Sequence, residues 1–148
     1  MSAYDDAVKL LARRAYSRRA IEQRLAAKGH DRQRVDEALA RLSSSGAIDD
    51  EAYARRFVAD RGTSRGPERL LGELEAAGID REVATRALEE RDDEPALLAA
   101  VRRRLGTPPG GADESRLARV YNALLSEGFE PGRIASALVP YGFRGDDA

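Results

Sequence analysis

One spacing of residues recurs three times along the chain, and it constrains the fold more than any other feature. A leucine is followed four places later by a glycine, two places after that by an acidic residue, and seven places further on by an Ala-Leu pair. The glycines of the three copies are Gly29, Gly78 and Gly128, which lie 49 and 50 residues apart. A repeat of this length indicates an array of similar supersecondary units.

Each copy of the motif predicts a helix, a tight turn and a second helix. The glycine can end the first helix in the left-handed conformation, and the acidic residue two places later can cap the next helix. The residue between them and the residue five places on have the spacing of a hydrophobic staple, most clearly in Phe129 and Ile134. A further stretch of apolar residues at helical spacing precedes each pair. We therefore expect nine helices, near residues 4–15, 18–28, 32–44, 50–61, 67–77, 81–91, 95–105, 114–126 and 131–139.

Composition supports an all-α fold. Alanine occurs 26 times and leucine 16 times, whereas valine, isoleucine and threonine together number 14. The strongest helix formers thus outnumber the β-branched residues about threefold. We predict three tandem three-helix units, at residues 1–48, 49–93 and 94–148, that stack into an elongated, curved array.

The charge distribution argues against a protein whose main task is to grip nucleic acid. The first predicted unit holds 10 basic and 6 acidic residues, the second 8 and 13, and the third 7 and 7. A chain that tracks a phosphate backbone is more often basic throughout, because each neutralised phosphate needs its own cation. The sequence instead favours binding to another protein.

The sequence offers little for catalysis. It has one histidine, no cysteine and no phosphate-binding loop, and its many carboxylates often precede an arginine by four residues, as on a solvated helix face. We expect no enzymatic activity, no cofactor and no metal site. The lack of cysteine, of an export signal and of a long apolar segment predicts a cytoplasmic protein that does not enter a membrane.

Three segments carry a family resemblance. Residues 17–29, which run from Ser17 to a Leu-Ala-Ala-Lys-Gly sequence, resemble the opening signature of the RecX family. Residues 45–54 are similar to that family's Gly-x-Ile-Asp-Asp segment, and residues 66–79 to its second Glu-Leu-x-x-x-Gly-Ile segment. The chain departs from the family at Ala20-Ile21, where a Glu-Leu pair is usual, and its third unit matches more weakly.

The resemblance implies a function. RecX proteins regulate the RecA recombinase in DNA repair, recombination and the SOS response. A protein of this kind lies in the groove of the RecA filament on single-stranded DNA and limits its growth, with loss of ATPase, strand exchange and repressor autocleavage. We expect a monomer whose direct binding to DNA, if any, is weak.

Basic residues of the first two units are the candidate contacts with that partner. Arg18 and Arg19 are the preferred ones, because they open a helix, where each positive charge costs about 0.3–1 kcal/mol against the helix dipole. Only one acidic residue, Glu22, stands at helical spacing after them, four places after Arg18 and three after Arg19, so it cannot neutralise both. The full candidate set is Arg13, Arg14, Arg18, Arg19, Arg24, Lys28, Arg55, Arg65 and Arg69.

Two other classes of function remain open from the sequence. An array of helix-turn-helix units could bind DNA directly, with Arg32, Gln33 and Arg34 as the credible base-reading residues. The second alternative is a scaffold of helical repeats that has no action on RecA. Activity on RecA together with little binding to DNA alone would separate the regulator from both.

Overall fold

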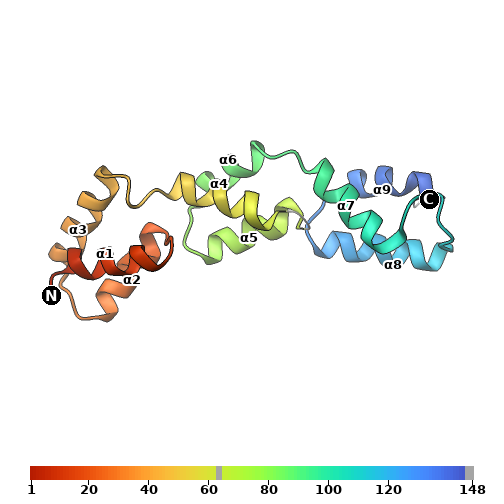
Figure 1. The fold of residues 1–148 in the computed structure, drawn as a ribbon. Coiled ribbons are helices and arrows are strands. Elements are labelled where there is room, and N and C mark those ends of the chain that lie inside the picture. Colours follow the sequence, from red (N-terminus) through yellow and green to blue (C-terminus); the bar gives the residue numbers. More distant parts are fainter. Residues whose placement is uncertain (63–64, 146–148) are drawn as a thin grey trace. The chain divides into compact units, whose positions relative to one another are not determined.

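The computed structural model describes residues 1–62 and 65–145, and within them the chain is helical, with no strand (Figure 1). The all-α prediction is therefore confirmed for this part of the chain. The helices are α1 (Ala3–Arg13), α2 (Arg18–Ala27), α3 (Arg32–Ser44), α4 (Asp50–Arg61), α5 (Pro67–Ala76), α6 (Arg81–Glu89), α7 (Glu94–Leu105), α8 (Glu114–Ser126), α9 (Pro131–Leu138) and a short 3₁₀ turn at Val139–Tyr141.

The three repeated turns have the same backbone geometry. Gly29, Gly78 and Gly128 have φ angles of +93°, +96° and +95°, in the left-handed region that favours glycine. After each glycine the next N–H donates to the carbonyl five residues back, as Phe129 does to Leu124 at 3.2 Å. This pattern is a Schellman motif, and it explains why one short sequence motif ends α2, α5 and α8 alike.

The helix starts also follow their predicted signals. The Asp31 carboxylate accepts from the backbone N–H of Arg34 at 2.9 Å, and that of Glu130 accepts from Gly132 at 3.3 Å. The predicted staple pair Phe129 and Ile134 is buried, with 3% and 0% of the surface exposed. One small difference occurs at α7, which begins at Glu94, one residue before the proline expected to open it.

The described residues form two compact units, and the boundaries between them fall inside α4, α5 and α6. The first compact unit comprises residues 1–57 and 73–87, and the second comprises 58–72 and 88–148. These boundaries differ from the three-unit division drawn from the sequence, which stays a prediction.

Each compact unit has its own apolar core. In the first, α1 packs against α2 and α3, and the core of these three helices is Ala3, Ala7, Ile21, Leu25, Val35, Ala38, Leu39, Leu42 and Ile48. In the second, α9 packs against α7 and α8 around Leu97, Val101, Leu117, Leu124, Phe129, Ile134, Leu138 and Tyr141. No helix in the described part of the chain is long and apolar enough to cross a membrane.

Candidate partner-binding site

The start of α2 is fixed by a buried serine with two roles. The hydroxyl of Ser17, which is 1% exposed, accepts from the backbone N–H of Ala20 at 3.1 Å and so caps the helix. The same hydroxyl donates to the carbonyl oxygen of Ala77 at 2.7 Å, at the turn that ends α5. The Ser17 side chain therefore holds the start of α2 against the turn after α5. This turn lies 60 residues later in the sequence and belongs to the same compact unit.

Removal of this hydroxyl should destabilise the first compact unit. We expect Ser17→Ala to lower the free energy of unfolding by about 2 kcal/mol, because a helix cap is lost and the Ala77 carbonyl loses its partner. Ser2→Ala is the matched control. Ser2 caps α1 through the N–H of Asp5 at 3.0 Å but is exposed, so its loss should cost about 1 kcal/mol or less. Urea unfolding followed by circular dichroism measures both values, and equal losses would contradict the double role.

The second compact unit contains a corresponding contact. The backbone N–H of Gly66, just before α5, donates to the carbonyl of Glu127 at 2.7 Å, and that of Glu68 donates to Gly128 at 3.3 Å. Gly66 follows Ser17 by one repeat, and Glu127 stands where Ala77 stands in the turn. The same kind of contact thus occurs twice. The start of α2 contacts the turn at Gly78, and the start of α5 contacts the turn at Gly128.

A pocket of about 320 Å³ lies beside the Ser17 contact, within the first compact unit. We call it the Tyr16 pocket. It is formed by the start of α2, one residue of α4 and the end of α5 with its turn, and its charged and aromatic lining residues are Arg14, Tyr16, Arg19, Arg24, Tyr53 and Glu75.

Two arginines of this pocket lie over its central aromatic ring. The guanidinium carbon of Arg14 is 5.0 Å from the centre of the Tyr16 ring, and that of Arg24 is 4.7 Å from it. Such cation–π contacts contribute about 0.5–1 kcal/mol each at exposed sites, and they restrict the orientation of the guanidinium groups. The half-buried Tyr16 ring thus orders two otherwise exposed cations.

The pocket carries an excess of positive charge. Within residues 1–62 and 65–145, none of Arg14, Arg19 and Arg24 forms an ion pair with a carboxylate. The one acidic lining residue, Glu75, pairs with Arg81 of α6 at 3.2 Å. Three guanidinium groups therefore face a space that holds a single, already paired carboxylate, and an anion is the ligand that this arrangement favours.

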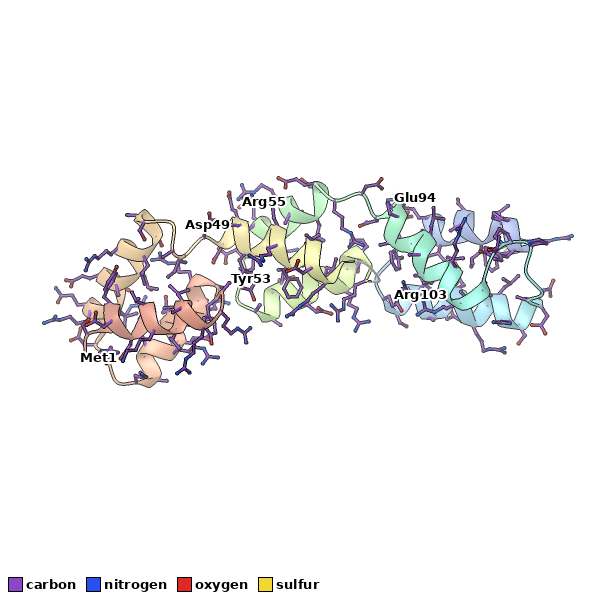
Figure 2. The ribbon with its side chains drawn as sticks, viewed as in Figure 1. Met1, Asp49, Tyr53, Arg55, Glu94 and Arg103 are labelled. Atoms are coloured by element: carbon purple, nitrogen blue, oxygen red, sulfur yellow. The ribbon has the colours of Figure 1, made fainter. Side chains whose placement is uncertain are left out.

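The other candidate contacts are not gathered in this pocket. The guanidinium of Arg18 donates to the hydroxyl of Ser43 at 2.9 Å, and its backbone N–H donates to the carboxylate of Asp50 at the same distance. Lys28 pairs with Asp6 at 3.5 Å. Figure 2 shows that Arg55 leaves α4 on a different side from Tyr53. Arg13 is exposed on α1 outside the pocket, and Arg65 and Arg69 belong to the second compact unit.

A separate polar cluster ties α1 to the turn after α2. Nε2 of His30 lies 2.6 Å from Oδ2 of Asp6, whose side chain is 8% exposed. The hydrogen bond from His30 and the charge of Lys28 lower the pKa of Asp6, although burial of the carboxyl acts in the opposite direction. The histidine is thus hydrogen-bonded in the turn, and no group of three or more potential metal ligands occurs in the part of the chain that the structure describes.

The lowered pKa of Asp6 predicts a loss of stability in acid. A carboxyl whose pKa is lower in the folded state stabilises the fold above its ordinary value, here 3.8, and this contribution disappears as the pH falls through the lowered value. We expect Asp6→Asn to be less stable than the parent at neutral pH and to lose less further stability below pH 3.8. Thermal midpoints measured across this range test it, and parallel pH profiles for the two proteins would refute the assignment.

Sequence reasoning did not identify several residues of the pocket. Tyr53 and Tyr16 carry no charge that would single them out in the sequence. The structure leaves Tyr53 half-buried in the pocket lining, with its ring stacked on Phe57 at 6.3 Å. No sequence signal points to Glu75, because its place in the pocket depends on the packing of α5 against the start of α2.

The repeated helical motif defines a helical repeat protein, a class of fold that commonly offers binding surfaces for other macromolecules. Comparisons with known proteins identify the family. The model of the RecX first three-helix domain matches residues 3–42, and that of the RecX second three-helix domain matches residues 49–88. The chain belongs to the RecX family.

Individual relatives support this membership. The chain is 33% identical over 132 residues to the regulatory protein RecX of Chromobacterium violaceum, covering 89% of this chain and 86% of the relative. It is 44% identical over 97 residues to the regulatory protein RecX of Thermus thermophilus, covering 66% and 67%. The crystal structure of RecX from Lactobacillus salivarius superposes with a TM-score of 0.82 over 94% of both chains at 19% identity, which supports the fold.

Proposed function

We propose that this RecX-family regulatory protein acts on the RecA recombinase by binding its filament on single-stranded DNA. The bound protein limits filament growth and thereby lowers ATPase, strand exchange and coprotease activity. Such a role would place it in the cytoplasm and link it to DNA repair and the SOS response. The observation that carries the proposal is the match of both RecX domain models, together with relatives named regulatory protein RecX over most of the chain.

The charge pattern supports a protein partner. The first compact unit contains 14 basic and 13 acidic residues, so it has no overall excess of cations to follow a phosphate backbone. Three arginines without carboxylate partners lie together at the Tyr16 pocket, which suits a local contact with acidic side chains.

Direct reading of DNA receives less support from the structure. Arg32 pairs with Glu22 at 3.4 Å and with Asp36 at 3.2 Å, while Gln33 donates to Glu37 at 3.3 Å. Arg32 and Gln33, two of the three residues expected to contact bases, are thus each bound to carboxylates, which would repel the backbone of DNA.

The functional assignment predicts inhibition of two RecA activities. We expect strand exchange and repressor autocleavage to fall when the protein is added at substoichiometric to equimolar ratios to RecA. A ligand with several binding units can engage more than one protomer at once, which favours action at low ratios. Strand exchange and repressor autocleavage are measured in parallel, because limited growth of the RecA filament should reduce both. Unchanged rates at saturating protein would refute the assignment.

A further inference from the structure

We propose that the Tyr16 pocket binds side-chain carboxylates of an acidic segment on the partner protein. The identification of that partner as RecA rests on the function proposed above, whereas the chemistry of the pocket does not. The pocket is therefore a recognition site for aspartate or glutamate side chains, with Arg14, Arg19 and Arg24 as the groups that contact them.

The geometry of the arginines suits the binding of carboxylates. A guanidinium group that lies over an aromatic face keeps the N–H groups in its own plane available as donors. Arg14 and Arg24 are held in this way at 5.0 and 4.7 Å from the centre of the Tyr16 ring. Because the fork of an arginine matches the two oxygens of a carboxylate, two oriented arginines form a receptor that loses little freedom on binding.

The fold itself does not need these arginines. One repeat further along, the positions of Arg19 and Arg24 are occupied by Glu68 and Glu73. The second copy of the helix-turn-helix motif nevertheless forms with the same turn geometry at Gly78. The positive charge at the Tyr16 pocket is thus a property of the first repeat alone, and its explanation lies in what the pocket binds.

The charge of the surrounding unit favours a single carboxylate over a phosphate backbone. The unit contains 14 basic and 13 acidic residues, so it has no overall excess of cations to attract a polyanion. A single carboxylate can pair with the arginines locally, whereas a nucleic acid strand gains affinity from many contacts in series.

A titration followed by nuclear magnetic resonance tests the proposal on the full chain without RecA. The probes are a short peptide with two adjacent glutamates, the same peptide with glutamines, and a short oligothymidylate, and the signals observed are the side-chain Nε–H groups of arginine. We expect the glutamate peptide to shift the signals of Arg14, Arg19 and Arg24, and the glutamine peptide to leave them in place.

Two variants locate the binding. The double variant Arg19→Gln/Arg24→Gln should raise the dissociation constant of the glutamate peptide about tenfold. The control Lys9→Gln/Arg34→Gln removes the same charge from exposed positions of the same compact unit and should leave it unchanged. Equal loss in both variants would overturn the proposal, because it would show an effect of net charge alone.

Two further results would also overturn it. One is the absence of any difference between the glutamate and glutamine peptides. The other is tighter binding of the oligothymidylate at the same three arginines, which would make the pocket a nucleic acid site. Failure of the parent protein to act on RecA, with glutamate binding intact, would refute the proposed function but support the pocket as a carboxylate site for another protein.

Discussion

Replacement of Gly128 by alanine is expected to lower the free energy of unfolding of the second compact unit by about 3 kcal/mol or more. Two costs combine at this position. The φ angle of +95° strains any residue with a Cβ, by about 1–2 kcal/mol. A Cβ would also lie 2.4 Å from the backbone nitrogen of Arg69 and 3.0 Å from that of Glu68, so the start of α5 would have to move.

The other two repeated glycines are matched controls, because they have nearly the same φ angle. A Cβ at Gly29 meets nothing within 4 Å, so Gly29→Ala should show the conformational strain alone, about 1–2 kcal/mol. A Cβ at Gly78 would lie 2.7 Å from the Ser17 hydroxyl, so Gly78→Ala should have an intermediate effect. We expect the destabilisation to increase from Gly29 through Gly78 to Gly128.

Urea unfolding gives the three values, and hydrogen exchange shows which segment loses protection in each variant. A loss of 1 kcal/mol corresponds to a fall of about 4–8 °C in the thermal midpoint for a unit of this size. Equal losses at all three positions would mean that backbone strain alone matters, and that the contact between a helix start and a later turn does not stabilise the fold.

Charge reversal at Arg19 is expected to have the largest effect on function. Arg19→Glu places a negative charge in the Tyr16 pocket and should weaken inhibition of the RecA filament at least about tenfold, or about 1.4 kcal/mol. Folding should be preserved, because an acidic residue in the first turn of α2 complements the helix dipole. Titration of RecA strand exchange with the variant gives the shift in the inhibitory concentration.

Arg34→Glu is the matched control for this variant. Arg34 is exposed in the first turn of α3, outside the Tyr16 pocket, and the substitution changes the charge by the same amount. Arg18→Glu should have a smaller effect than Arg19→Glu, because the Arg18 side chain contacts Ser43 and does not line the pocket. If Arg34→Glu weakens inhibition as much as Arg19→Glu, the effect is one of overall charge and the pocket is not the contact.

The helices could be predicted from the sequence because their limits depend on local chemistry. The glycine turns, the Asp31 cap and the buried Phe129–Ile134 staple each involve residues within a few positions of one another. Such signals do not depend on how distant segments pack. All the helices accordingly begin within one residue of their predicted starts.

The candidate site could be predicted only in part, because it depends on contacts between distant segments. The sequence indicated Arg14, Arg19 and Arg24 among nine basic candidates and preferred Arg18 together with Arg19. The partners of Arg18, which are Ser43 of α3 and Asp50 of α4, could not be foreseen from its neighbours in the sequence. The pairing of His30 with Asp6 joins residues 24 positions apart. The division into two compact units, with boundaries inside α4, α5 and α6, likewise has no marker in the local sequence.

The proposed function requires that the protein act on the RecA filament and not on DNA alone. The most direct measurement is the ATPase rate of RecA on single-stranded DNA with increasing amounts of this protein, alongside its binding to the same DNA without RecA. We expect the ATPase rate to fall steeply at or below equimolar protein, while binding to bare DNA stays weak at those concentrations. An unchanged ATPase rate, or a loss of rate that follows equally tight binding to DNA alone, would contradict it.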